Sequence, residues 1–240
     1  MPTMTQLPDD YAASRRELQR IATHVLARAR ATHGGRFGLR VTASGIGTPP
    51  FGPEETVVRI AGTTLVVEGQ TPDGRAAASS ALAGVSLADA ASFVGITLDE
   101  PFSPGADAPP VGDPDAPLVL GAASVAIALD WYGLGARVLD AVLPHLDGPV
   151  AAQLWPEHFD LGSGAGNGGG VNLGASPGDA GGDGPYLYVG PWTDARPGDP
   201  EYWNAPFGAV ATRADLLATG DPFAAGVAFL LRGLTLLDGD

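Results

Sequence analysis

Residues 118–143, LVLGAASVAIALDWYGLGARVLDAVL, decide the fold, because they form the longest helical pattern in the chain. Alanine, valine and leucine surround the first half of this pattern on nearly every side, which predicts a central and buried helix. Asp130 and Asp140 give the second half a polar edge. Gly133 and Gly135 are weak helix formers, so we expect a bend or an interruption there.

Strand patterns precede and follow this helix in the sequence. In them, apolar and polar residues alternate, or short apolar runs lie between turn residues. The predicted strands are residues 37–41, 56–60, 64–68, 152–161, 170–175 and 185–189. Further helices, each behind a capping Asp, Ser or Thr, are predicted at 11–32, 87–94, 213–218 and from Pro222 onward. The predicted fold class is α+β. An antiparallel sheet, built from the N-terminal strands and a three-stranded meander, packs against the long central helix and the terminal helices.

Length and composition fit one globular domain. The chain has 240 residues, of which 45% are hydrophobic and 17% charged, and such a chain can bury a sizeable core. We predict a single domain over residues 1–240. If the chain is divided, the expected place is the loop at 101–117, which is rich in proline, aspartate and glycine.

Charge and composition exclude several function classes. The net charge is −14, all 13 basic residues are arginine, and lysine and cysteine are both absent. A surface this acidic repels nucleic acid, and a chain without cysteine has no disulfides, thiol nucleophiles or cysteine-ligated zinc. The longest apolar run, 117–129, is too short to span a membrane, and the N-terminus lacks a signal-peptide pattern. We therefore expect a soluble, cytoplasmic protein that binds neither nucleic acid nor membrane.

Polar and aromatic residues concentrate between positions 154 and 192, where we expect the functional site. The segments are 154–160 (LWPEHFD), 171–179 (VNLGASPGD) and 185–192 (PYLYVGPW). Side chains alternate along a strand, so His158 and Asp160 are predicted to share one face, where Asp160 can fix the tautomer of the imidazole. Such a pair is a minimal general acid and base. A histidine that only stabilises the sheet is the alternative, and it stays open.

The same stretch supports a binding pocket, since aromatic surfaces with a few polar groups make ligand sites. The predicted pocket walls are Trp155, Tyr186, Tyr188 and Trp192. Asp179 and Asp183 flank glycines in one loop and are the predicted ligands of a metal ion. The leading hypothesis is a soluble small-molecule binding protein. The alternatives are an enzyme with His158 as general base, with or without a metal, and a structural or homodimeric interaction protein. The ligand and any cofactor are unknown.

Three familiar motifs fail on chain order or backbone chemistry. Residues 174–178 match the GxSxG nucleophile elbow, but Pro177 has no N–H for an oxyanion hole and no histidine follows. The glycines of 164–169 have the spacing of a dinucleotide fingerprint, yet a strand pattern follows where a helix is needed. His158-x-Asp160 resembles part of a facial iron triad, which requires a later histidine, and His158 is the last one.

The segments LWPEHFDL, VNLGASPGD, PYLYVGPW and WNAPFGA resemble a group of uncharacterised proteins from actinobacterial genomes. Those proteins pair a Trp-x-x-His/Ser-Phe-Asp-Leu strand with a downstream Gly-x-x-Pro-Gly-Asp turn and a tyrosine-rich strand. The resemblance covers residues 153–210. It carries no assigned activity, and it implies that residues 154–192 form one structural unit.

Overall fold

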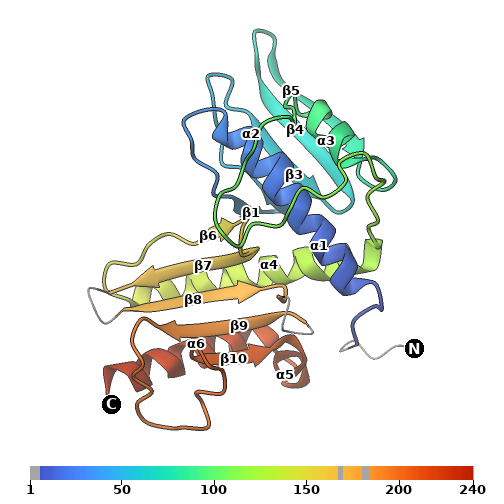
Figure 1. Ribbon diagram of the computed structural model, residues 1–240. Helices are drawn as coiled ribbons and strands as arrows, with labels where there is room; N and C mark the ends of the chain where they lie inside the picture. The colour runs from blue at the N-terminus through green and yellow to red at the C-terminus, as the bar shows by residue number, and fades with distance from the viewer. Residues whose placement is uncertain (1–5, 167–169, 180–183, 240) are drawn as a thin grey trace. The chain divides into compact units, whose positions relative to one another are not determined.

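The computed structural model describes residues 6–166, 170–179 and 184–239 and has an α+β fold with two five-stranded antiparallel sheets (Figure 1). The helical segments are α1 (Tyr11–Ile21), the π-helical turn η1 (Ala22–Ala27), α2 (Arg28–Ala31), α3 (Leu87–Phe93), α4 (Ala122–Val142), the 3-10 turn η2 (Leu143–His145), α5 (Arg213–Ala218) and α6 (Pro222–Asp238). The strands are β1 (Arg40–Thr42), β2 (Gly45–Gly47), β3 (Val57–Ala61), β4 (Thr64–Thr71), β5 (Gly74–Ala81), β6 (Gln153–Trp155), β7 (Asp160–Ala165), β8 (Val171–Ser176), β9 (Tyr186–Pro191) and β10 (Ala209–Thr212). Strand order follows the sequence in both sheets, so each sheet is a meander.

The chain repeats one order of elements. A long helix and a five-stranded meander are followed by one further helix, α3, in the first half and by two, α5 and α6, in the second. Packing divides the chain into two compact units. The N-terminal unit contains Pro8–Asp130 and Leu154–Phe159, and the C-terminal unit contains Met1–Leu7, Trp131–Gln153 and Asp160–Asp240. The chain therefore passes between the units before Pro8, inside α4 and on either side of the segment 154–159. The loop at 101–117, the expected place of a division if the chain is divided, lies within the N-terminal unit.

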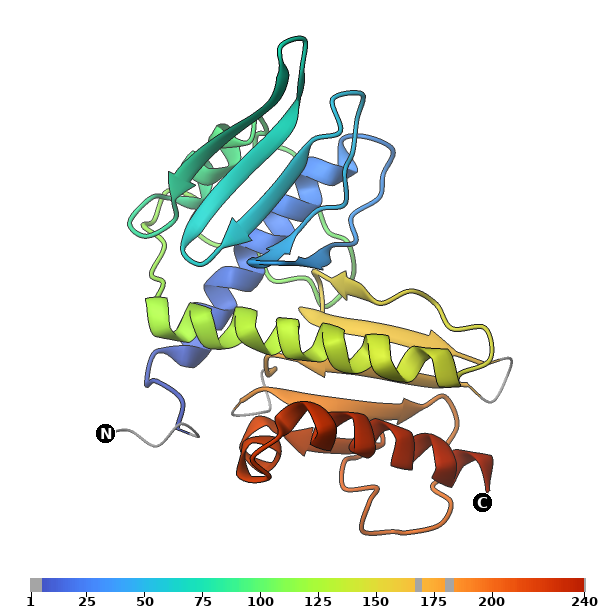
Figure 2. The same ribbon diagram turned by 180° about the vertical axis from the view of Figure 1, so that it is seen from behind.

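In the N-terminal unit, the continuous helix α1–η1–α2 lies on one face of the sheet (Figures 1 and 2). Leu18, Ile21 and Leu26 of the helix and Ile60 and Leu65 of the sheet are fully buried. Burial of one such side chain contributes about 1.5–3 kcal/mol. This layer of helix on sheet is the core of the unit.

In the C-terminal unit, the second half of α4 and helix α6 cover one face of the sheet (Figure 2). Gly135 of α4 permits a close approach, since a Cβ there would lie 2.4 Å from the Cβ of Ala175. Gly226 of α6 plays the same part, with its added Cβ 2.9 Å from Leu187 Cδ1. Helix α4 runs through Gly133 and Gly135 without interruption, so the glycine that weakens the helical pattern serves helix–sheet packing.

The helix predictions are close to the observed boundaries. Ser86 and Thr212 are N-caps of α3 and α5, and each forms a complete capping box. Helix α4 begins at Ala122 rather than at residue 118. The reason is that Leu118 is extended, and its N–H donates to the carbonyl oxygen of Val85 at 2.8 Å.

The strand predictions were less complete. Strand β5, GRAAASSA, is mostly exposed and lacks hydrophobic alternation, yet it pairs with β4 along its whole length. Strand β2 was also missed. The N-terminal strands and the later strands form two separate sheets, and the later meander has five strands rather than three. The predicted strand 152–161 is not continuous. Residues 153–155 form β6 and residue 160 begins β7, because Pro156 has no N–H for a ladder and the chain turns between them.

Candidate functional site

Residues 156–159 of the WPEHFD run form a turn in the N-terminal unit, whereas Trp155 ends β6, and Asp160 begins β7 in the C-terminal unit. Phe159 has a φ of 54°, and its N–H donates to the carbonyl oxygen of Trp155 at 2.7 Å. Helix η1 holds the turn, because Thr23 Oγ1 donates to the carbonyl oxygen of Pro156 at 3.0 Å. Glu157 is buried and Trp155 is exposed. The side-chain alternation expected of a strand is therefore absent.

His158 and Asp160 have separate partners. The side chain of His158 is 56% exposed, and its Nδ1 lies 3.5 Å from Oδ2 of the exposed Asp107, a surface contact that contributes little stability. Asp160 begins β7 in the C-terminal unit, and its Oδ2 accepts a hydrogen bond from the hydroxyl of Tyr188 at 2.5 Å. The shared strand face on which the general acid and base pair depended does not exist. Residues 154–192 also do not form one unit, contrary to the expectation from the resemblance.

Several predicted site residues lie together on one face of the C-terminal sheet. Leu187 and Val189 are fully buried on the side of the helices, so Tyr186 and Tyr188, which alternate with them along β9, project to the other side. Within the described part of this unit, no helix covers that side (Figure 1). We call the group there the open-face cluster. It consists of Tyr186, Tyr188, Phe207, Asp160 and Asp179.

The rings of the open-face cluster meet edge to face. The ring centroids of Tyr186 and Tyr188 are 6.3 Å apart with planes at 60°, and those of Tyr188 and Phe207 are 6.3 Å apart at 87°. The hydroxyl of Tyr188 donates to Asp160, and that of Tyr186 donates to Asp179 Oδ2 at 2.8 Å. Each tyrosine is therefore held both by a neighbouring ring and by a carboxylate. Little rotamer freedom is left to be lost when a ligand binds.

Glycines on the neighbouring strand make room for these rings. Tyr188 lies against Gly174 of β8, where an added Cβ would come within 2.4 Å of the ring. Trp192 lies in the same way against Gly170, whose added Cβ would come within 2.8 Å of the indole. Trp192 is 51% exposed, and its Nε1 donates to Asn172 Oδ1 at 2.8 Å. The aromatic side chains thus lie against the sheet instead of extending into solvent.

A carboxylate lies at the hydroxyl of each of the two tyrosines. Burial first, and then the hydrogen bond to Asp179, raise the pKa of Tyr186 to about 12. Burial and the charge of Asp160 hold the pKa of Tyr188 well above its ordinary value. Both hydroxyls are therefore neutral donors at neutral pH. Among the described residues, no guanidinium group lies over either ring.

A second aromatic group in the same unit holds the protein's own cations. The ring centroids of Tyr202 and Trp203 are 4.9 Å apart with planes at 88°. The guanidinium carbon of Arg232 lies 5.4 Å from the centroid of Tyr202, and Arg232 also forms an ion pair with Asp199. Arg196 lies 5.7 Å from the centroid of Trp203. We call these five residues the loop cluster.

The remaining predicted residues are placed in part. Trp155 is exposed and belongs to the N-terminal unit, whereas Tyr186, Tyr188 and Trp192 belong to the C-terminal unit. The predicted metal ligand Asp183 lies outside the described residues. Across residues 6–166, 170–179 and 184–239, no group of three or more His, Asp or Glu side chains is arranged to hold a metal ion. The metal site stays a prediction.

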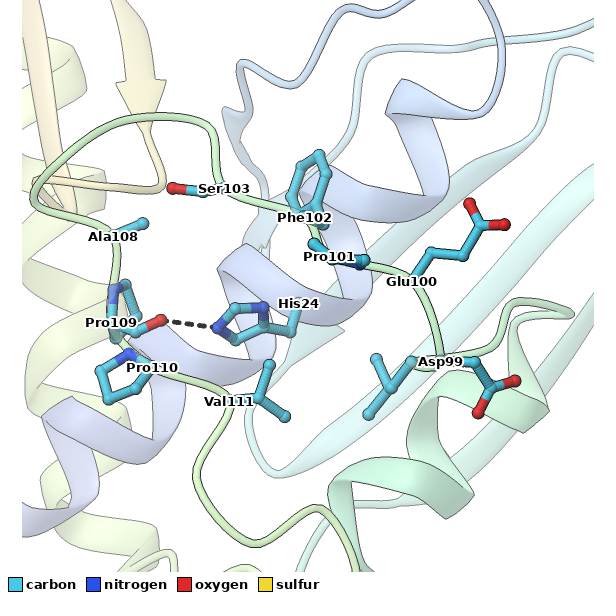
Figure 3. Close-up of a pocket in the computed structure, with 11 residues that line it drawn as sticks. His24, Asp99, Glu100, Pro101, Phe102, Ser103, Ala108, Pro109, Pro110 and Val111 are labelled. Carbon is cyan, nitrogen blue, oxygen red and sulfur yellow. Dashed lines mark hydrogen bonds between the residues drawn. The ribbon is translucent and has the colours of Figure 1, made fainter.

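The sequence did not reveal a pocket that lies in the N-terminal unit (Figure 3). It has a volume of about 510 Å³ and lies between η1 and the loop 98–111. His24 of η1 lines it and is only 2% exposed, and its Nε2 lies 2.7 Å from the carbonyl oxygen of Pro109. π-helical turns are rare and are often found at functional sites. A readable signal was the four-residue spacing of Arg20, His24 and Arg28, which places three donors on one helix face.

No protein-family model, curated protein or solved structure matches this chain. The resemblance to actinobacterial proteins therefore stays a prediction. Of the helices in the described part of the chain, none is long and apolar enough to cross a membrane.

Proposed function

We propose that this chain is a small-molecule binding protein whose ligand is a compact organic cation held by the open-face cluster. The contrast between the two aromatic clusters of the C-terminal unit carries the proposal. Two guanidinium groups of the protein lie over the rings of the loop cluster. The tyrosine rings of the open-face cluster have none among the described residues. Aromatic faces attract cations electrostatically, so these rings are suited to a cation supplied by a ligand.

The charge of the site favours a cation over an anion. The carboxylates of Asp160 and Asp179 lie within hydrogen-bonding distance of the two tyrosine hydroxyls. An anion would be repelled by these carboxylates and by the net charge of −14, whereas the same field steers a cation toward the surface.

The arrangement of the rings favours a compact cation over a flat ligand. A flat molecule such as a sugar ring needs a broad aromatic surface with one orientation. The ring planes of Tyr186, Tyr188 and Phe207 instead meet at 60° and 87°. A tetrahedral alkylammonium group presents methyl groups in several directions, and such groups are bound by aromatic rings that face different ways.

Choline and 3,3-dimethylbutan-1-ol test the proposal. They have the same shape, but choline has a positively charged nitrogen where the alcohol has a neutral carbon. Isothermal titration calorimetry of the full chain should detect choline and should give an affinity for the neutral analogue that is about ten-fold lower. Phe223→Leu is the matched control, since Phe223 is an exposed aromatic residue on helix α6. That variant should bind choline as the unmodified chain does. Equal affinity for both probes, or no binding of choline, would contradict the proposal.

The enzyme and homodimer hypotheses stay predictions. The described partner of His158 is Asp107, and both side chains are more than half exposed. A general base of this kind lacks the fixed orientation that catalysis requires.

A further inference from the structure

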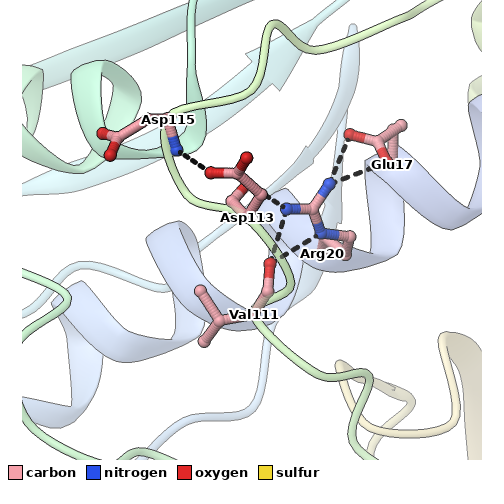
Figure 4. A network of polar contacts seen from close by, with 5 residues as sticks. All are labelled: Glu17, Arg20, Val111, Asp113 and Asp115. Atoms are coloured by element: carbon pink, nitrogen blue, oxygen red, sulfur yellow. Dashed lines mark hydrogen bonds and ion pairs between the residues drawn. The ribbon is translucent and has the colours of Figure 1, made fainter.

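Helix α1 holds the loop that follows α3 through Arg20. Its guanidinium group donates to the carbonyl oxygens of Val111, at 3.1 Å from Nε, and of Asp113, at 3.2 Å from Nη2 (Figure 4). Glu17 pairs with the same group at 2.8 Å, so the charge of Arg20 is compensated on the helix itself. The later limb of the loop is thereby tied to the helix.

Two further residues on the same helix face hold other points of the loop. His24 bonds the carbonyl oxygen of Pro109, and Arg28 donates to the carbonyl oxygen of Glu100 at 2.6 Å. The two limbs of the loop, 98–103 and 108–111, are thus fixed to one helix, and they enclose the pocket with His24 between them (Figure 3). The walls of the pocket are therefore held in place by hydrogen bonds between the loop and the helix.

One buried polar atom of His24, beside this pocket, is unsatisfied within the described residues. The carbonyl oxygen of Pro109 can only accept a hydrogen bond, so Nε2 of His24 carries the proton. Burial lowers the pKa of His24, as do the charges of Arg20 and Arg28, and the imidazole is neutral. Nδ1 is then a lone-pair acceptor, and it has no partner within the described residues. An unsatisfied buried group of this kind is costly, and a ligand that satisfies it regains that free energy.

The surroundings of the imidazole restrict the ligand further. Its near walls are Pro101, Phe102, Pro110 and Val111. The carboxylates of Asp99 and Glu100 point away from it (Figure 3). A carboxylate ligand would place lone pairs against the lone pair of Nδ1. A ligand with an apolar body can pack against these walls, and a single donor group on it can bond the nitrogen. A pocket of about 510 Å³ is large enough for a ring-sized molecule.

We propose that the pocket beside η1 binds a neutral, ring-sized organic molecule whose O–H or N–H group donates a hydrogen bond to Nδ1 of His24. This site uses other residues and another ligand class than the open-face cluster, so either proposal can fail alone. Phenol and toluene are the probes, because they share a ring and only phenol has the donor. Phenol should shift the Nδ1 resonance of His24 in nitrogen NMR spectra, and toluene should bind about ten-fold more weakly. The resonances of His33, His145 and His158 are internal controls and should not move.

His24→Phe removes Nδ1 and keeps an aromatic ring at the site, so the preference for phenol over toluene should disappear. His33→Phe, at an exposed histidine near the end of the same helix, should keep that preference. If His24→Phe does not fold, the response of the Nδ1 resonance to phenol in the unmodified chain still tests the proposal. The proposal is overturned if toluene binds as tightly as phenol, if Nδ1 carries the proton in the free protein, or if saturating phenol leaves the Nδ1 resonance unchanged.

Discussion

The loop cluster and the open-face cluster of the C-terminal unit are built from similar parts and differ in one of them. In the loop cluster, the ring of Tyr202 carries the guanidinium group of Arg232, which is paired with Asp199. In the open-face cluster, Tyr188 donates to Asp160, and no guanidinium lies over its ring among the described residues. Both clusters combine aromatic rings with carboxylates, and within the described residues only the loop cluster has guanidinium groups over its rings.

The pKa shifts of Tyr202 and Tyr188 also differ between the two clusters in the sign of the neighbouring charge. Burial raises the pKa of Tyr202, and the positive charge of Arg232 partly opposes that rise. Burial also raises the pKa of Tyr188, and there the negative charge of Asp160 adds to it. The charges nearest the two rings therefore have opposite signs. A cation from outside has most to gain at the cluster whose field is negative and whose rings have no guanidinium group over them among the described residues.

The largest expected effect is that of Tyr188→Leu, which removes the central ring of the open-face cluster together with its hydrogen bond to Asp160. Choline affinity measured by calorimetry should fall by about ten-fold or more. Tyr188→Phe keeps the ring and should lose much less. Unchanged choline affinity in Tyr188→Leu would remove this tyrosine from the site.

Two glycine-to-alanine variants each introduce a close contact with a tyrosine, one in each cluster. An added Cβ at Gly174 would lie 2.4 Å from the ring of Tyr188, and one at Gly233 would lie 2.4 Å from the hydroxyl oxygen of Tyr202. Gly174→Ala and Gly233→Ala should each lower the free energy of unfolding by about 1–3 kcal/mol in urea titrations. Only Gly174→Ala should also weaken choline binding. The comparison fails if both variants weaken it alike.

Removing the internal cation has a smaller effect. Arg232→Gln breaks an exposed ion pair and removes the charge over Tyr202, so unfolding experiments should show a loss of about 0.5–1 kcal/mol. Choline affinity at the open-face cluster should stay the same, because Arg232 does not contact it. A loss of choline binding in this variant would show that the two clusters are not independent.

The smallest expected effect is a dependence of stability on high pH. Tyr186 has a pKa of about 12 in the folded chain, above the ordinary tyrosine value of about 10 in the unfolded chain. The folded state then binds more protons, so stability falls as pH rises from about 10 to about 12. Tyr186→Phe should reduce this slope in urea titrations across that range. An identical slope in both proteins would contradict the assigned environment of Tyr186.

Local signals in the sequence predicted the helices better than the strands. Capping boxes at Ser86 and Thr212 depend on residues three positions apart, and both are present. Strand β5 depends on its pairing with β4 and on no pattern of its own. The turn 156–159 was missed because LWPEHFD reads as an alternating strand unless the missing N–H of Pro156 is given more weight.

The candidate site was predicted only in part, because some of its residues have local signals in the sequence and others depend on tertiary contacts. Tyr186 and Tyr188 were found from composition, and their shared face follows from the alternation of one strand. Phe207 joins them only through tertiary packing. The unpartnered Nδ1 of His24 depends on a carbonyl group far along the chain, at Pro109, which no local pattern reveals.

Nuclear Overhauser contacts between the methyl protons of choline and the aromatic protons of the chain test most directly whether the open-face cluster takes a cation from a ligand. The account predicts contacts to the rings of Tyr188 and Tyr186, which Tyr188→Leu should abolish, and no contacts to Tyr202. Bound choline with contacts to Tyr202 or Trp203 alone, or without any contact to Tyr188, would contradict it.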